Sequence, residues 1–281
     1  MDSGNSRLRS TISYALAKVG LVCGVGLFIG NIPNQASLSV VEPIPTGVVP
    51  AITDPGMPAL PSQCQPNAVY EKAQQFTVRV FSDNSQGSGI LIRRQGQLYT
   101  VLTNRHVLEE NAPYQVQMSD QQVYSAWEDK AVRFGLNDLA LVQFRSVFKT
   151  YNPAALASSK ALSTGETVYA TGFPVEIEDS LTSEIKFTCG QVSFILDKAL
   201  EGGYQVGYTN DIWKGMSGGP VLNSTGEVVA VNGMHAYPLW GDPYIYQDGS
   251  KPSPRTRELL IHSSWAIPIE KVTVSLSQFK Q

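Results

Sequence analysis

From about Asn67 onward, the chain consists of short β-branched and aromatic runs separated by residues that favour turns. Such runs predict β-strands, because branched and aromatic side chains fit a pleated, half-buried surface. Strands are expected at residues 76–81, 89–92, 98–103, 138–144, 167–172, 185–196, 204–208, 220–222, 228–231 and 259–262. Many short strands without intervening helices favour an all-β fold of two antiparallel barrels.

Two other stretches of this region have a different texture. Residues 269–279 are the only segment expected to end as a helix, although their Val, Thr and Ser content is weak for one. Residues 237–254 are rich in proline and glycine and predict a long surface loop.

The first 32 residues have the layout of a secretory signal. Arg7 and Arg9 precede residues 19–30, which are apolar or glycine and carry no charge. We expect a signal peptide here, or a membrane anchor if the apolar stretch extends back past Lys18. The protein is therefore expected to be exported to the periplasm or the extracellular space, with membrane attachment through this segment as an alternative to cleavage.

Residues 33–65 contain seven prolines and almost no charge, which predicts an extended linker or pro-segment. Residues 66–281 are expected to form the folded domain. Its first barrel is predicted at about 66–150 and its second at about 160–270.

Composition narrows the classes of partner. The net charge is −3, from 21 basic and 24 acidic residues, and the chain has no basic run, so a nucleic-acid partner is not expected. The three cysteines lack the spacing of a zinc site, and neither a metal nor another cofactor is predicted. Cys64 and Cys189 could form one disulfide bond in an exported protein or remain two buried thiols. The oligomeric state is not predicted.

Candidate chemistry centres on Ser217, which lies between small residues in the segment 215–220. Glycines on either side allow a tight turn and a close approach of substrate to the main chain. The backbone N–H groups of Gly215 and Ser217 could then stabilise an oxyanion. A hydroxyl needs a general base, and His106 follows an apolar strand that would hold its imidazole rigidly. Asp138, at the start of another strand, could orient that imidazole.

These three stretches resemble the signatures of the trypsin-like (chymotrypsin-fold) serine peptidases, in the same order along the chain. Residues 103–107 (TNRHV), 137–141 (NDLAL) and 215–220 (GMSGGP) are similar to the histidine, aspartate and serine motifs of the compact bacterial and cyanobacterial members. Residues 264–268 resemble their closing strand. The resemblance implies two six-stranded barrels with the triad between them. It also implies a serine endopeptidase that hydrolyses polypeptides through an acyl-enzyme intermediate.

The sequence departs from the family pattern at one position and matches trypsin's own sequence at another. Met216 replaces the acid that precedes the nucleophile, so activation through an ion pair with a new N-terminus is not expected. Asp211 stands where trypsin has its pocket acid, which suggests a preference for Lys or Arg before the scissile bond. Lys214 could neutralise Asp211, and an acid of a solvated loop is the alternative interpretation. By the same resemblance, Val231, Asn232 and Gly233 should form the strand that pairs with the substrate backbone.

Two other functions fit parts of the pattern. A catalytically inactive module could keep this fold and bind a peptide in the cleft. An acyl hydrolase would share the short pattern Gly-x-Ser-x-Gly but requires a helix directly after the serine. Residues 220–222 instead predict a strand, which argues against that second alternative.

Overall fold

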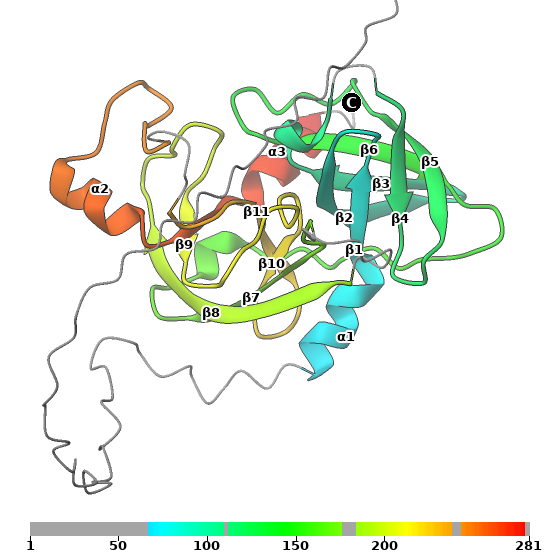
Figure 1. The fold of residues 1–281 in the computed structure, drawn as a ribbon, viewed down its shortest axis with the longest axis horizontal. Coiled ribbons are helices and arrows are strands. Elements are labelled where there is room, and N and C mark those ends of the chain that lie inside the picture. Colours follow the sequence, from blue (N-terminus) through cyan, green and yellow to red (C-terminus); the bar gives the residue numbers. More distant parts are fainter. Residues whose placement is uncertain (1–66, 110–111, 176–183, 238–242, 279–281) are drawn as a thin grey trace, which may run out of the picture. The chain divides into compact units, whose positions relative to one another are not determined.

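The computed structural model describes residues 67–109, 112–175, 184–237 and 243–278. Strands dominate this part of the chain, and Figure 1 shows them together with three short helices. In chain order the helices and strands are α1 (Asn67–Phe76), β1 (Thr77–Phe81), β2 (Gln86–Gln95), β3 (Leu98–Thr103), the 3₁₀ turn η1 (Arg105–Val107), β4 (Tyr114–Gln117), β5 (Val123–Glu128), β6 (Ala140–Arg145), the 3₁₀ turn η2 (Ser159–Ala161), β7 (Thr167–Gly172), β8 (Lys186–Ile195), β9 (Val206–Tyr208), β10 (Pro220–Leu222), β11 (Val228–Met234), α2 (Pro254–Leu260), β12 (Ser264–Pro268) and α3 (Glu270–Gln278).

The first barrel contains β1 to β6 and closes in the order β1-β2-β3-β6-β5-β4. On β1, Val78 and Val80 are fully buried, whereas Arg79 and Phe81 lie on the other face and are partly exposed. This alternation follows from the period of two along a strand. Tyr99 and Phe144 stack with ring centroids 5.0 Å apart across the paired strands β3 and β6.

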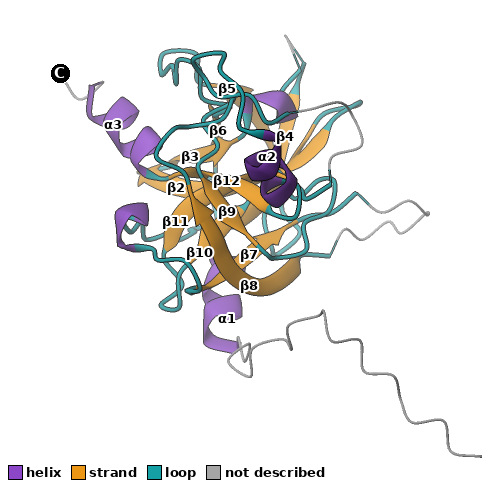
Figure 2. Ribbon diagram, turned by 90° about the vertical axis from the view of Figure 1, so that its left-hand side faces the viewer, coloured by secondary structure: helices purple, strands orange, loops and turns teal. Residues whose placement is uncertain are grey.

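The second barrel contains β7 to β12 and closes in the order β10-β11-β12-β9-β8-β7. The long strand β8 pairs with β7 on one side and β9 on the other, and Figure 2 shows it curving beside both. Trp265 of β12 is fully buried, and its indole N–H donates to the backbone oxygen of Leu260 at 3.1 Å. The large aromatic side chain thereby gains apolar contact without an unpaired donor.

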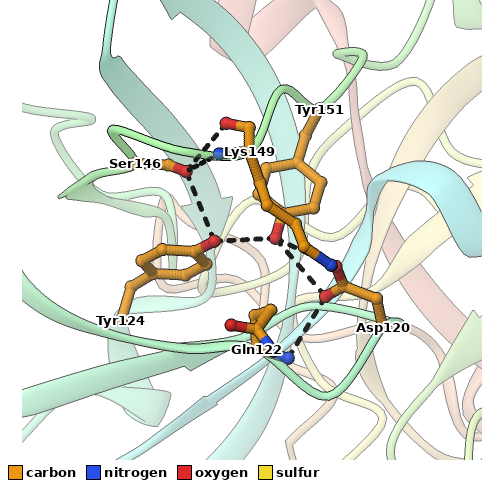
Figure 3. Close-up of polar contacts among 6 residues, drawn as sticks. All are labelled: Asp120, Gln122, Tyr124, Ser146, Lys149 and Tyr151. Carbon is orange, nitrogen blue, oxygen red and sulfur yellow. Dashed lines mark hydrogen bonds and ion pairs between the residues drawn. The ribbon is translucent and has the colours of Figure 1, made fainter.

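A polar cluster fixes the turn that follows β6 (Figure 3). The Ser146 hydroxyl donates to the backbone oxygen of Lys149 at 2.8 Å and accepts from the Lys149 amide at 3.3 Å. Tyr124 and Tyr151 share a hydrogen bond of 2.7 Å, and the Lys149 ammonium group pairs with Asp120 at 2.6 Å. Burial, together with the neighbouring Tyr124 hydroxyl and the Asp120 charge, raises the pKa of Tyr151. The cluster therefore holds a hydrogen-bonded tyrosine pair next to an ion pair.

The predicted all-β fold of two six-stranded antiparallel barrels with a C-terminal helix is confirmed. The strand predicted at 259–262 is wrong, because Leu260 ends helix α2 and a turn follows. Helix α2 begins with a capping signal that was overlooked because the preceding residues are rich in proline and glycine. Pro254 occupies its first turn, and the Ser253 hydroxyl accepts from the Thr256 amide.

Helix α1 and the strands β4 and β5 were also missed. Strand β5 keeps the alternation of a strand, but none of its side chains is fully buried and its residues include Ser125 and Glu128. Its hydrophobic signal was therefore too weak to detect from sequence.

The predicted signal or anchor (1–32) and linker (33–65) lie outside the described residues. Within the described part, none of the helices is long and apolar enough to cross a membrane. Cys189 lies on β8 and is disulfide-bonded. Both other cysteines, Cys23 and Cys64, fall outside the described part of the chain, so the pairing of Cys64 with Cys189 stays a prediction.

Candidate active site

His106 and Asp138 are held together by the first barrel. His106 lies in the 3₁₀ turn η1 directly after β3, and Asp138 lies two residues before β6, the strand that pairs with β3. Between them, the buried Asn104 side-chain amide donates to the backbone oxygen of Asp138 at 2.8 Å. Because two paired strands deliver these residues at the same barrel edge, residues far apart in sequence become neighbours.

Asp138 accepts three hydrogen bonds at its carboxylate. Its Oδ1 accepts from the backbone amide of His106 at 2.9 Å, and its Oδ2 lies 2.5 Å from the Nδ1 of that imidazole. The Tyr204 hydroxyl donates to the same Oδ2 at 2.6 Å. Burial alone would raise the pKa of Asp138, but the hydrogen bonds and charge of His106 and the Tyr204 hydroxyl outweigh it, so the pKa lies below its ordinary value. The carboxylate is therefore ionised and fixes Nδ1 as the protonated nitrogen, which leaves Nε2 as the acceptor.

Ser217 lies in the loop between β9 and β10 and lines the same cleft as His106. Its hydroxyl donates to the backbone oxygen of Gly233 at 3.2 Å. No hydrogen bond joins this hydroxyl to His106 in the described part of the chain. Catalytic hydrogen bonds are often long or absent without substrate and form only once substrate is bound.

Two backbone amides beside Ser217 have no acceptor among the described residues, namely those of Gly215 and Ser217. The peptide carbonyl before Gly215 is engaged elsewhere, because the oxygen of Lys214 accepts from the Val175 amide at 2.8 Å. Gly215 has φ +95°, and a Cβ atom there would lie 2.6 Å from the oxygen of Phe173. Glycine is therefore required at 215 by both conformation and space. The two available N–H groups can serve as oxyanion donors.

Ser88 of β2 connects the Ser217 loop, residues 215–219, to the first barrel. Its amide donates to the oxygen of Ser217 at 2.8 Å, and its hydroxyl donates to the oxygen of Gly215 at 2.7 Å. The same hydroxyl accepts from the Phe173 amide at 2.8 Å. Ser88 is fully buried, so each of these bonds replaces one that water would otherwise make. One residue thus holds the backbone on both sides of Met216.

Met216, which occupies the position of the family's acid, is fully buried. Its carbonyl oxygen accepts from the Asn232 side-chain amide at 2.9 Å, and the Asn232 side-chain oxygen accepts from the buried Tyr208 hydroxyl. Neutral hydrogen bonds therefore hold this loop. After Gly219 the chain enters strand β10, not a helix, which differs from the local context an acyl hydrolase requires.

The cleft that contains His106 and Ser217 has a volume of about 810 Å³. Gly215 and Gly233 line it on the side of the second barrel, and Arg79 and Ser85 line it on the side of the β1–β2 hairpin. Trp213, which is 47% exposed, adds an apolar wall. A cleft of this size can accommodate several residues of an extended peptide.

The residues predicted to bind substrate do not all line the cleft. Gly233 lines the cleft, whereas Val231 and Asn232 are fully buried, and the Asn232 side chain supports the loop of residues 215–219. Asp211 is exposed and lines a smaller neighbouring pocket of about 220 Å³, which shares Ile212 and Trp213 with the main cleft. No ion pair joins Asp211 to Lys214 within the described residues.

Sequence reasoning missed Tyr204 and Ser88. Neither residue belongs to a motif with fixed spacing to the triad candidates. Tyr204 was assigned only to a strand, and Ser88 is one of several serines close to glycine. Their contacts join the two barrels, so no local pattern could have indicated them.

Comparison with known proteins places this geometry in context. Residues 87–231 match the family model of the trypsin-like peptidase domain. The chain is 28% identical over 213 residues to the periplasmic pH-dependent serine endoprotease DegQ of Escherichia coli, a match that covers 72% of this chain and 44% of DegQ. It is 32% identical over 152 residues to the putative serine protease HhoA of Synechocystis sp., covering 52% of this chain and 36% of HhoA.

A third relative is the serine protease Do-like HtrA of Bacillus subtilis, which is 30% identical over 159 residues, covering 54% of this chain and 34% of that protein. In each case the match spans less than half of the relative's length.

Proposed function

Because the chain belongs to the trypsin-like peptidase family, we propose that it is a serine endopeptidase with His106 as base, Asp138 as orienting carboxylate and Ser217 as nucleophile. The Nε2 atom of His106 takes the hydroxyl proton while the Ser217 oxygen attacks the substrate carbonyl carbon. The amides of Gly215 and Ser217 donate to the resulting oxyanion. The leaving amine then takes the proton from His106, and water hydrolyses the acyl-enzyme.

The observation that carries this proposal is the double hydrogen bond between Asp138 and His106, in a cleft shared with Ser217. A histidine that serves only as a surface residue does not require a carboxylate that accepts hydrogen bonds from both its backbone amide and its ring. The arrangement orients one ring nitrogen and leaves the other for proton transfer. The amides of Gly215 and Ser217, which have no acceptor among the described residues, add the electrostatic element that such chemistry needs.

A fluorophosphonate probe tests the proposal, because it labels only an activated serine hydroxyl. The full chain is expected to incorporate one probe molecule at Ser217, and labelling should disappear in Ser217→Ala and fall at least a hundredfold in His106→Ala. Ser146→Ala, which removes a buried serine outside the cleft, serves as the matched control and should label normally. Absence of labelling in a folded wild-type protein would contradict the proposal.

The inactive peptide-binding module has one observation in its favour, namely that Ser217 donates to Gly233 and not to His106. That alternative predicts peptide binding without labelling or cleavage. Measuring both on the same sample therefore separates the two functions.

We further propose that the substrates are polypeptides and that the protein is exported to the periplasm. Relatives named as periplasmic endoproteases and the charge pattern of residues 1–32 support this. A basic residue before the scissile bond remains our proposal for Asp211, which lines a pocket adjoining the cleft.

A further inference from the structure

The β1–β2 side of the cleft contains a cation that has no carboxylate partner among the described residues. Arg79 projects from the outer face of β1, and its guanidinium donates to the side-chain oxygens of Gln86 and Gln117. It also stacks over the Phe81 ring, 4.7 Å from the ring centroid. These partners are neutral, so they orient the guanidinium without compensating its charge. Its Nε atom is buried and makes no hydrogen bond to any described residue.

Partial burial makes this uncompensated charge significant. Desolvation lowers the pKa of Arg79 relative to a free arginine, although the group stays charged. Each terminal nitrogen has an N–H beyond the one given to a glutamine, and a carboxylate matches such donors geometrically. Asp83 lines the same cleft but is exposed and forms no ion pair in the described structure, so solvent screens its charge.

The position of Arg79 identifies the part of the substrate that it faces. The leaving amine lies beside His106, which must protonate it. The β1–β2 hairpin packs against the next residue, since the Ser85 hydroxyl donates to the backbone oxygen of Val107 at 2.7 Å. The hairpin therefore borders the segment of substrate that follows the scissile bond.

We infer that Arg79 forms a subsite for an Asp or Glu side chain of the polypeptide substrate, at the first or second position after the scissile bond. The inference rests on the proposed function and adds a substrate class to it.

The test uses internally quenched peptides that differ only in carrying Glu or its neutral isostere Gln at those two positions. The full chain is expected to cleave the Glu peptides about tenfold more efficiently, by kcat/KM, with a ratio that shrinks as salt is added. Arg79→Met should bring the ratio close to one. Arg94→Met removes an exposed arginine of the same barrel, outside the cleft, and should keep the ratio.

Equal cleavage of Glu and Gln peptides by the wild type would overturn the subsite, as would a ratio that persists in Arg79→Met. Binding of the same labelled peptides to Ser217→Ala needs no turnover. A charge preference in Kd therefore supports the subsite even if peptide hydrolysis fails, and its absence there overturns it.

A second inference comes from a different contact. Tyr204 is buried on the second barrel side, and its hydroxyl donates to Asp138 Oδ2 at 2.6 Å. Its ring occupies the space beside Gly233, where an added Cβ atom would lie 2.5 Å from the hydroxyl oxygen. Gly202 accepts from the Asp138 amide at 2.8 Å in the same region. Burial and the Asp138 charge raise the pKa of Tyr204, so its hydroxyl stays protonated and donates.

We propose that Tyr204 is a positioning residue that holds the Asp138 carboxylate against His106. Tyr204→Phe removes only the hydroxyl that donates to Asp138 and keeps the ring that lines the cleft, so it should lower kcat about tenfold with little change in KM. The only ionisable groups bonded to Asp138 in the described structure are His106 and Tyr204. Without the tyrosine, Asp138 takes up a proton at higher pH, so the acidic limb of the kcat profile should move upward.

Tyr99→Phe is the matched control, because Tyr99 is buried in the first barrel and its hydroxyl accepts from the Tyr151 amide outside the cleft. It should keep both kcat and the pH profile. An unchanged kcat and acidic limb in Tyr204→Phe, with the protein folded, would refute the positioning role. Labelling by the fluorophosphonate probe reports separately whether Ser217 is activated at all.

Discussion

Replacing Ser88 by alanine removes one hydroxyl that joins the first barrel to the nucleophile loop. The change leaves the Gly215 oxygen without its donor at 2.7 Å and the Phe173 amide without its acceptor at 2.8 Å. Both residues are buried, so water does not replace the lost partners. Each of the two unsatisfied groups costs about 1–3 kcal/mol, and we expect a loss of roughly 2–6 kcal/mol in the free energy of unfolding.

The rate of catalysis should fall as well. The Gly215 carbonyl group loses the hydrogen bond that holds it, so the Gly215 N–H, a proposed oxyanion donor, is held less firmly. A complete oxyanion donor contributes about 3 kcal/mol to the transition state. If loosening forfeits about half of that value, kcat falls roughly tenfold, with little change in KM. A peptide boronic acid, whose bound adduct places an oxygen in the oxyanion position, should bind more weakly by a similar factor.

Ser146→Ala provides the matched control for this measurement. Ser146 is also a buried serine of the first barrel that donates to one backbone oxygen and accepts from one backbone amide, but it lies in the turn cluster of Figure 3 and lines no part of the cleft. Thermal unfolding and steady-state kinetics on both variants separate stability from activity. Equal losses of kcat in the two variants, or a Ser88→Ala enzyme with wild-type kcat, would refute the reasoning.

Three other changes have defined outcomes. Gly215→Ala should lower kcat at least a hundredfold in peptide hydrolysis, because the new Cβ atom meets the Phe173 oxygen at 2.6 Å and φ is +95°; wild-type activity would contradict the assigned loop geometry. Asp211→Asn should reduce cleavage after Lys or Arg about tenfold relative to cleavage after Leu in a peptide library. If the wild type cleaves equally well after charged and neutral residues, Asp211 is not part of the pocket. Glu270 accepts from Ser158 and Ser159, and these bonds outweigh burial and lower its pKa. The stabilising contribution of Glu270 is therefore present above the unfolded-state pKa of about 4.3 and is lost as pH falls through the folded value. The free energy of unfolding of Glu270→Gln should accordingly depend less on pH between about 5 and 3 than that of the wild type. An unaltered pH dependence would argue against a lowered pKa at Glu270.

The sequence predicted elements whose side chains carry strong local signals. Residues 98–103 and 167–172 alternate or run apolar between turn residues, and both strands occur with the predicted bounds. His106, Asp138 and Ser217 stood out because each lies in a short peptide whose residue types serve its own chemistry. Strand β5 was not predicted because its residues are half exposed and partly polar. Helix α2 was not predicted because it lies in a Pro-rich part of the sequence.

Tyr204 and Ser88 illustrate why part of the candidate site was beyond sequence. Their importance depends on which barrel lies opposite, and the positions involved, 88 with 215 and 138 with 204, are separated by 127 and 66 residues respectively. A tyrosine before a strand and a serine between glycines are common in proteins. Only the three-dimensional contact distinguishes them from ordinary core and loop residues.

These contacts also explain how the nucleophile loop keeps its shape without an acid beside Ser217. In place of a charge pair at position 216, the buried Asn232 amide holds the Met216 oxygen, and Ser88 holds the oxygens of Gly215 and Ser217 from the other barrel. Tyr204 of the second barrel holds Asp138 of the first in return. Each barrel thus orients functional groups carried by the other, so the complete arrangement depends on docking of the two barrels. Neutral hydrogen bonds, unlike an ion pair with an N-terminal ammonium group, do not weaken when that group loses its proton, and we expect a loop held in this way to be ordered without a newly cut N-terminal amine.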